Sequence, residues 1–95
     1  MIRSFADRRA QAILQGRDPG KGFSADLVTV ARRKLVMLDA AAALADLRSP
    51  PANRLEKLAG DRKGQYSIRI NDQHRICFLW KNGGAENVEI VDYHD

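Results

Sequence analysis

Residues 65–80 read QYSIRINDQHRICFLW, and this stretch decides the fold. Two runs that alternate apolar and polar residues flank the polar segment NDQ at 71–73. Alternation with a period of two predicts β-strands over 65–70 and 74–80, and the short polar link predicts an antiparallel hairpin. We expect Asn71 to oppose Arg75, with residues 72–74 in the turn. A slip by one residue would turn the apolar side chains of one strand to the wrong side.

This pairing gives the two faces of the hairpin different chemistry. One face is apolar and consists of Tyr66, Ile68, Ile70, Ile76, Phe78 and Trp80. The other face carries Ser67, Arg69, Asn71, Arg75, Cys77 and Leu79. A last strand is predicted over 87–91, where Val88 and Ile90 extend the apolar face and Glu89, Val91 and Tyr93 join the Arg75 face. The sequence therefore predicts one side of a sheet for helices and one side that gathers arginines beside the chain's end.

The residues before the hairpin predict two helices. A short strand is expected over 1–5, and Asp7 can cap a helix that runs to Leu14 or Gln15 and stops at Gly16. Ser24 can cap a longer helix that ends at the prolines of Ser49-Pro50-Pro51. Its apolar stripe at helical spacing consists of Leu27, Ala31, Leu35, Leu38, Ala42 and Ala45. A further strand is expected over 54–58 and a polar turn over 60–64.

The fold class follows from this order of elements. Two helices followed by a run of strands predict an α+β domain, with both N-terminal helices on one face of a small, largely antiparallel sheet. The 95 residues suffice for a single domain over 1–95, and a content of 44% hydrophobic and 29% charged residues is ordinary for a folded protein. No apolar run approaches the length of a membrane span or of a signal-peptide core.

The charge and the cysteine content limit the classes of function that the sequence supports. The net charge is +4, and residues 1–75 hold 15 of the 16 Lys and Arg but only 8 of the 12 Asp and Glu. A basic body attracts phosphate backbones, although it is equally consistent with a merely soluble domain. The only cysteine, Cys77, excludes an intrachain disulfide, suits the cytoplasm and is expected to be a buried, inert thiol. No residues have the spacing of a metal site, and no cofactor is expected.

Candidate chemistry lies at the end of the last strand, in Asp92-Tyr93-His94. His94 suits proton transfer, Asp92 can orient it, Tyr93 can stack on a base, and Arg75 can hold a phosphate. Taken alone, each residue is better explained without catalysis, since a histidine near the chain's end is usually a solvated tail residue and a lone arginine on a strand is usually a surface charge. Their convergence with Arg54, Lys57 and Arg69 on neighbouring strands favours RNA cleavage. Arg62 and Lys63 are expected to be solvated in a turn. His74 is expected to be structural or exposed, with contact to RNA as the less favoured alternative.

The segments NRLEKLAGDRKGQYSIRINDQHRICF (53–78) and VEIVDYH (88–94) closely resemble HigB-type toxins of the RelE/ParE superfamily. The segments MIRSFAD and KLVMLDAAAALADLRSPPANRLE extend the resemblance over nearly the whole chain. The resemblance implies a RelE-like curved sheet with two helices on one side. It implies a ribosome-dependent, metal-independent endoribonuclease that cuts messenger RNA in the decoding site and leaves a cyclic phosphate. It also implies a helix-turn-helix antitoxin of the HigA type as partner.

The resemblance also assigns residue roles. The phosphate-binding arginine falls on Arg75 and the acid–base tail on Asp92, Tyr93 and His94, while Glu56 and Gln73 fall at polar active-site positions. Contacts with ribosomal RNA are expected from Arg32 and Arg33 on the long helix and from Arg62 and Lys63.

Two positions depart from the family pattern. Ala59 stands where many relatives carry a lysine, so Lys57 or Arg54 would have to replace it. His74 stands where many carry tryptophan, which we expect to alter the packing of the turn. The rival interpretation is a non-enzymatic inhibitor of DNA gyrase, like the ParE toxins of the same superfamily, because fold alone does not separate the two.

Overall fold

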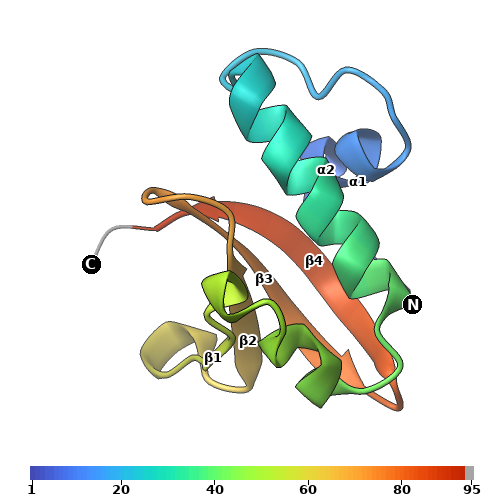
Figure 1. Cartoon of the computed structure of the whole chain (residues 1–95), viewed down its shortest axis with the longest axis vertical. Coiled ribbons are helices and arrows are strands. Elements are labelled where there is room, and N and C mark those ends of the chain that lie inside the picture. The colour runs from blue at the N-terminus through green and yellow to red at the C-terminus, as the bar shows by residue number, and fades with distance from the viewer. Residues whose placement is uncertain (94–95) are drawn as a thin grey trace.

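A computed structural model describes residues 1–93 of the chain. Within them, a four-stranded antiparallel sheet of order β1-β2-β3-β4 follows two α-helices (Figure 1). The helices are α1 (Arg8–Leu14) and α2 (Ala25–Ala40), and the strands are β1 (Glu56–Lys57), β2 (Gln65–Arg69), β3 (His74–Lys81) and β4 (Gly84–Asp92). Short 3-10 turns form η1 (Leu44–Arg48), η2 (Pro51–Asn53) and η3 (Gly60–Arg62). The predicted α+β class is confirmed.

Both helices begin where the sequence predicted. The side chain of Asp7 accepts a hydrogen bond from the backbone N–H of Arg9, and that of Ser24 accepts one from Leu27. Each bond satisfies one of the backbone donors that a helix leaves free in its first turn. Asp7 does more, because its second carboxylate oxygen accepts from the N–H of Ile90 at 3.2 Å and so ties the start of α1 to β4.

The end of α2 differs from the prediction. The helix stops at Ala40, well before the prolines, and Ala41 has an extended backbone with ψ 127°. The carboxylate of Asp46 accepts hydrogen bonds from the N–H groups of Ala42 and Ala43, both at 3.0 Å. These bonds satisfy backbone donors outside the helix and start η1 instead. Ala42 and Ala45, predicted on the buried stripe, are therefore exposed.

The first residues lie beside β4 in parallel orientation. Ile2 bridges Ala85 and Phe5 bridges Val88, through backbone hydrogen bonds that include Arg3 N–H to Ala85 at 2.8 Å and Ala6 N–H to Val88 at 3.0 Å. The predicted first strand is thus a pair of isolated bridges. It covers the edge of β4 that β3 leaves open.

The hairpin keeps the predicted faces but not the predicted register. Arg75 pairs with Arg69, not with Asn71, so the alignment is displaced by two residues. A shift of two preserves side-chain parity, which is why the apolar set still faces one way. The cause lies in Asn71, whose Oδ1 accepts from the backbone N–H groups of Gln73 and His74, both at 2.8 Å. These bonds close a local turn, so Asn71 leaves the ladder.

β4 contains a bulge that aligns its buried residues. Two residues, Asn87 and Val88, lie between Glu86, which pairs with Leu79, and Glu89, which pairs with Cys77. Asn87 has a positive φ of 52°, and its N–H donates to the Ser4 hydroxyl at 2.8 Å. The extra residue reverses the alternation along the strand.

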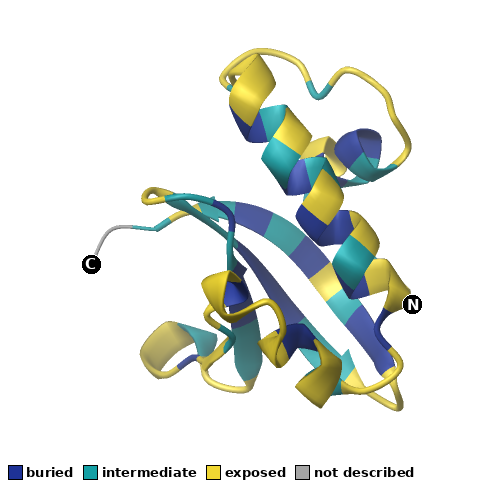
Figure 2. Ribbon diagram, viewed as in Figure 1, coloured by how far each residue is buried: buried dark blue, intermediate teal, exposed yellow. Residues whose placement is uncertain are grey.

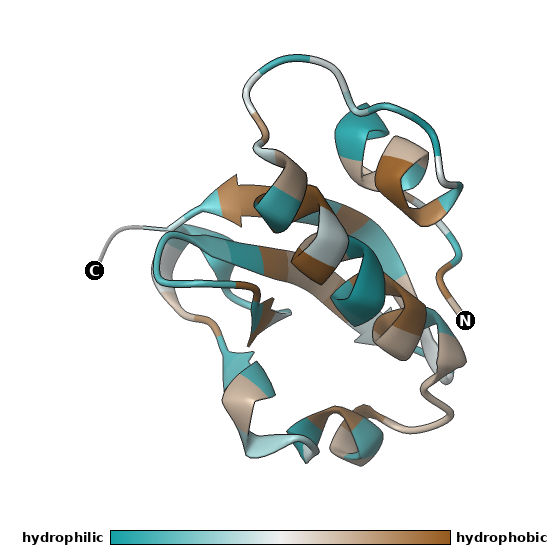
Figure 3. Ribbon diagram, turned by 45° about the horizontal axis from the view of Figure 1, so that its top comes forward, coloured by the Kyte–Doolittle hydropathy of each residue, from teal (hydrophilic) through white to brown (hydrophobic). Residues whose placement is uncertain are grey.

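The core lies between the helices and the apolar face of the sheet. Ala31, Leu35 and Leu38 of α2 have no exposed surface and share one cluster with Ile76 and Phe78 of β3. Buried residues follow the inner stripe of α2 (Figure 2), and hydrophobic and hydrophilic residues alternate along this helix (Figure 3). Tyr66 and Trp80, predicted on the apolar face, are partly buried and pack against this cluster. No helix within residues 1–93 has both the length and the apolar character needed to cross a bilayer.

Candidate functional site

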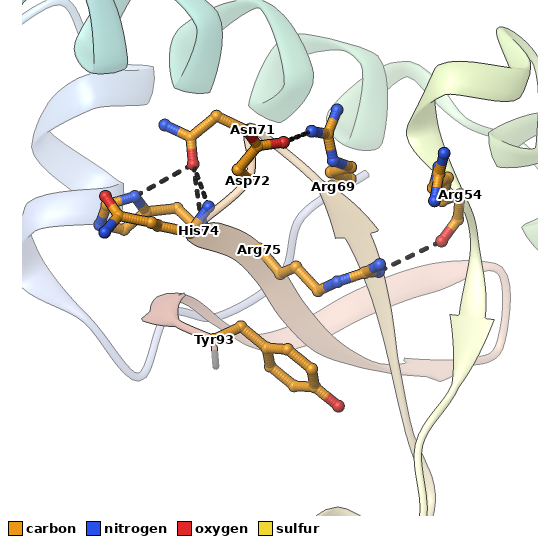
Figure 4. Close-up of a pocket in the computed structure, with 8 residues that line it drawn as sticks. Arg54, Arg69, Asn71, Asp72, His74, Arg75 and Tyr93 are labelled. Carbon is orange, nitrogen blue, oxygen red and sulfur yellow. Dashed lines mark hydrogen bonds and ion pairs between the residues drawn. The ribbon is translucent and has the colours of Figure 1, made fainter. Parts of the chain in front are cut away.

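A pocket of about 210 Å³ opens at the turn end of the β2–β3 hairpin. Three arginines line it, Arg54, Arg69 and Arg75 (Figure 4). Tyr93 and the turn residues Asn71, Asp72, Gln73 and His74 complete the lining. Cations outnumber carboxylates three to one among these residues, so the pocket suits an anion such as a phosphate.

Arg75 is fixed at the base of this pocket by three acceptors. Its Nη1 donates to Ser67 Oγ at 2.9 Å and to the carbonyl oxygen of Arg54 at 3.3 Å, and its Nη2 donates to Glu56 Oε1 at 3.2 Å. Only 12% of the Arg75 side chain is exposed, against 49% for Glu56. The guanidinium is therefore held in one orientation, and its carboxylate partner can move into solvent.

Arg54 reaches the pocket through an unusual backbone. It ends η2 with φ 45° and ψ 57°, the left-handed region that residues with a Cβ rarely adopt. Its N–H donates to the carbonyl of Pro51 at 3.1 Å, and its own carbonyl receives Arg75. This strained turn aims one cation at the pocket and orients a second.

Arg69 and Tyr93 form two further sides of the pocket. Arg69 is bonded to the carboxylate of Asp72, which is 94% exposed. The guanidinium carbon of Arg75 lies 5.4 Å from the centre of the Tyr93 ring, a cation–π distance. The N–H of Tyr93 donates to the carbonyl of Gln73 at 2.5 Å, so the end of β4 is bonded to the hairpin turn.

A row of paired residues crosses the same face below the pocket. Glu56, Ser67, Cys77 and Glu89 occupy matching positions on the four strands. Arg62 of η3 donates to Glu89 at 2.5 Å and to Gln65 at 3.0 Å, and the bond to Glu89 raises the pKa of Arg62. Ser67 and Cys77 have no exposed surface. Burial raises the pKa of the Cys77 thiol, as does Glu89, while Arg62 and Arg75 oppose the shift.

Several predicted residues lie away from this pocket. Lys57 pairs with Tyr66, so it lies on the opposite face of the sheet from Glu56, and it lines a separate groove with Arg48 and Leu55. Of the two proposed substitutes for the missing lysine at position 59, only Arg54 therefore lines the pocket.

The predicted ribosomal contacts are not brought together at the pocket either. Arg32 is partly buried and donates from Nε to the carbonyl of Ile13 at 2.9 Å. Arg62 is not merely solvated in a turn, because it is bonded to Glu89 and Gln65. Arg33 and Lys63 are exposed.

The acid–base tail is only partly described. Tyr93 lines the pocket, whereas Asp92 ends β4 in register with His74 and is exposed. His94 lies outside the described residues. Sequence reasoning did not place Asn71 or Asp72 at a site, although an Asn in a short polar turn is a signal for such local bonding. Among residues 1–93, no three His, Cys, Asp or Glu side chains form a metal-binding group.

The fold and the basic pocket define a small α+β protein of the RelE-like class. A chain of the YoeB–YefM complex from Staphylococcus aureus has the same fold, with a TM-score of 0.58, 18% identity, and coverage of 100% of this chain and 99% of that one. A heterotetrameric YoeB–YefM toxin–antitoxin complex from the same organism gives a TM-score of 0.60. The family model described as RelE-like toxin of type II toxin-antitoxin system HigB matches residues 3–94, so the chain belongs to this family.

Two named relatives agree with that assignment. The chain is 56% identical to Toxin HigB-1 of Vibrio cholerae over 55 residues, which is 58% of each protein's length. It is 30% identical to Endoribonuclease HigB of Proteus vulgaris over 94 residues, which cover 99% of this chain and 100% of that protein. An uncharacterized protein of Haemophilus influenzae is 37% identical over 84 residues. The predicted membership of the HigB family is confirmed.

Proposed function

We propose that this toxin is a cytoplasmic endoribonuclease that cleaves messenger RNA on the ribosome and so arrests cell growth. The observation that supports it most is the convergence of Arg54, Arg69 and Arg75 on one pocket beside Tyr93. Cleavage of RNA builds negative charge on phosphorus, and fixed guanidinium groups stabilise such charge in the transition state. The relative from Proteus vulgaris is named an endoribonuclease, which agrees with this chemistry.

The proposed reaction is an internal phosphoryl transfer. The 2′-oxygen loses its proton and forms a bond to phosphorus, while the bond from phosphorus to the 5′-oxygen breaks, and that oxygen gains a proton. The products are a 2′,3′-cyclic phosphate and a 5′-hydroxyl, so no water is consumed in this step and no metal or cofactor is required by the balance. The acid and base roles are proposed for His94 and Asp92, whose side chains adjoin Tyr93 in sequence.

Arg75 is proposed to bind the scissile phosphate. Its present partner Glu56 lies 3.2 Å away and is half exposed, so an incoming phosphate can replace that carboxylate at the same guanidinium edge. A displaced Glu56 would then be available as a further proton acceptor beside the 2′-hydroxyl. Gln73, at the rim, is proposed to contact a base, and Tyr93 to stack on one.

The partner is proposed to be an antitoxin, of the helix-turn-helix kind that the HigB resemblance implies. Two of the solved structures with this fold are complexes of YoeB with YefM, one of them titled a toxin–antitoxin complex, which supports an antitoxin here.

The test is to map the ends of messenger RNA after induction of the wild type, Arg75→Ala and His94→Ala. We expect new 5′-hydroxyl ends within ribosome-bound messages for the wild type only. Purified protein should cut a message in the ribosome and leave the naked message nearly intact. Equal cutting of naked RNA would contradict the ribosome requirement. Growth arrest without cut messages, but with loss of DNA supercoiling, would favour a gyrase inhibitor instead.

A further inference from the structure

A second basic hollow lies on the helical layer, outside the pocket just described. It has a volume of about 300 Å³ and is formed by α1 and the loop that follows it. Arg8, Arg9 and Arg17 line it, and all three are exposed. Asp18 is the only carboxylate among its lining residues, and its Oδ1 already accepts from the N–H of Gly20 at 2.8 Å. Arg9 Nε is paired with Asp7 Oδ1 at 3.3 Å, and Arg17 Nε donates to Gln15 Oε1 at 3.0 Å. The hollow still presents three arginines against one carboxylate among its lining residues.

Aromatic contacts join this hollow to the arginine pocket. The guanidinium carbon of Arg9 lies 4.5 Å from the centre of the Phe23 ring. The rings of Phe23 and His74 form a T-shaped contact, with their centres 6.2 Å apart and their planes at 84°. His74 lines the arginine pocket, and in Figure 4 it lies at the end of the pocket away from Arg54. His74 shares the lining of the arginine pocket with Arg54 and Arg75, and the contacts from His74 to Phe23 and from Phe23 to Arg9 lead from there to α1.

We propose that this series is the path of a single RNA strand. A strand whose phosphate occupies the arginine pocket leaves it over His74 and Phe23, and its next phosphates bind Arg9, Arg8 and Arg17. This inference rests on the proposed function, because it extends the same RNA site. Proteins that bind single strands combine a line of cations along the backbone with aromatic side chains near the bases. The exposed guanidinium groups of Arg8, Arg9 and Arg17 provide that line. The bond of Arg9 to Asp7 uses only its Nε, and the bonds of Arg17 to Gln15 use its Nε and Nη2, which leaves the remaining N–H groups for phosphate.

The path predicts that affinity depends on RNA length. A dinucleotide can occupy the arginine pocket alone, whereas an octanucleotide can also reach α1. The gain in affinity from two to eight nucleotides should therefore depend on Arg8 and Arg17, while binding of the dinucleotide should depend on Arg75. Each lost phosphate contact lowers the slope of log affinity against log salt by about 0.7 for a single strand.

The experiment uses 2′-O-methyl RNA, which lacks the attacking hydroxyl, and measures affinity by fluorescence anisotropy at several salt concentrations. The variants are Arg8→Ala/Arg17→Ala, Arg75→Ala and a matched control, Arg48→Ala/Lys57→Ala, which removes two exposed cations from the separate groove beside β1. We expect the first double variant to lose about fivefold or more of the length gain and about 1.4 of the salt slope. The control should behave as the wild type, and circular dichroism should show that all variants are folded.

Different outcomes would contradict the proposed RNA path and the proposed function of the toxin. It is overturned if the wild type gains nothing from the longer strand, or if Arg8→Ala/Arg17→Ala gains as much as the wild type. An equal loss in the control would also overturn it, because general charge would then explain the effect. Loss of antitoxin binding without loss of the RNA length gain would assign the hollow to a protein partner instead. A dinucleotide that binds Arg75→Ala and wild type equally counts against the proposed function alone.

Discussion

Arg69 and Arg75 are direct partners across the antiparallel ladder between β2 and β3. Two like charges at opposed positions of a sheet destabilise it by roughly 0.2–1 kcal/mol. Asp72 offsets the charge of Arg69 only in part, because that carboxylate is 94% exposed and such surface pairs contribute about 0–1 kcal/mol. Arg75 has structural partners in Ser67 and Glu56, so the charge that fold stability does not explain is that of Arg69, and the proposed anion site would account for it.

Replacement of Arg69 by threonine should separate stability from activity. Threonine suits a strand and removes the repulsion, so we expect Arg69→Thr to keep the wild-type free energy of unfolding or to raise it by up to about 1 kcal/mol. Cleavage of ribosome-bound message should fall, because the pocket loses one of its three cations. Urea denaturation and primer extension measure the two effects. A variant that is clearly less stable than the wild type would show that Arg69 is structural.

Ser67 should control the orientation of Arg75. Its hydroxyl accepts from Arg75 Nη1 at 2.9 Å beneath the pocket and has no exposed surface. Ser67→Ala should cost about 1 kcal/mol of stability through the lost hydrogen bond. We expect it to lower the rate of cleavage by about tenfold, because a misdirected guanidinium no longer meets the phosphate in the right geometry.

Cys77 provides the matched control for Ser67. The two residues are partners in the ladder and equally buried, but no hydrogen bond joins Cys77 to Arg75. Cys77→Ala should therefore cost stability and leave the rate of cleavage near the wild-type value. Equal loss of activity in both variants would mean that general loosening of the sheet, rather than Arg75 orientation, causes the defect.

The faces of the hairpin could be predicted from the sequence, whereas several boundaries could not. Period-two alternation in 65–80 fixes which side chains share a face, and this survived the two-residue error in register. The error arose because the bonds from Asn71 Oδ1 to the turn are local and compete with the ladder. The early end of α2 depends on Asp46, whose bonds to Ala42 and Ala43 outweigh the helix propensity of the alanine run.

The sequence predicted some residues of the candidate pocket correctly and misplaced others, because strand alternation applies only within the strands. Strand parity brings Arg69 and Arg75 to one pocket and the chain's end brings Tyr93 there, whereas Arg54 reaches it from the end of η2 and Gln73 from the hairpin turn. Lys57 was grouped with them because it was expected on a neighbouring strand, but its pairing with Tyr66 in β1 turns it to the other face. The proposed extension of the site to α1 could not be predicted from the sequence, because the contact between Phe23 and His74 joins segments far apart in the chain.

Lys34 should make stability depend on alkaline pH. Its ammonium is buried between α2 and η2 and donates to Asn53 Oδ1 at 2.5 Å. Burial, with Arg33 and Arg69, lowers the pKa of Lys34 below its ordinary 10.5. The unfolded chain therefore binds more protons than the folded one between the lowered pKa and 10.5. The cost of burying the charge is full below that window and is relieved as pH rises through it.

A comparison with Lys34→Met isolates this effect. Methionine keeps most of the side-chain volume but cannot ionise, and the unpaired Asn53 oxygen costs the same at every pH. The stability of the wild type relative to Lys34→Met should therefore increase between pH 7 and pH 10, as measured by urea denaturation. The raised pKa of Cys77 acts in both proteins and cancels in the difference. A difference that stays constant over this range would show that Lys34 ionises normally in the folded state.

Replacement of Arg54 by glycine should change the rate of cleavage without lowering the stability of the fold. Its left-handed backbone, with φ 45° and ψ 57°, is unfavourable by roughly 1–2 kcal/mol for a residue that has a Cβ, and glycine adopts it without that cost. Arg54→Gly keeps the backbone carbonyl that accepts from Arg75 at 3.3 Å and removes only the side chain from the pocket. We therefore expect unchanged or greater thermal stability together with a loss of cleavage of about tenfold or more.

The neighbouring lysine tests whether the effect belongs to the pocket. Lys57→Ala removes an equal charge three residues away, but on the opposite face of the sheet. Many relatives carry a lysine where this chain has Ala59. If a cation of the pocket replaces that lysine, Arg54→Gly must impair cleavage and Lys57→Ala must not. Primer extension on ribosome-bound message compares the two directly, with denaturation curves for both. If Lys57→Ala impaired cleavage and Arg54→Gly did not, the phosphate would bind in the separate groove beside β1, and the assignment of Arg54 would be wrong.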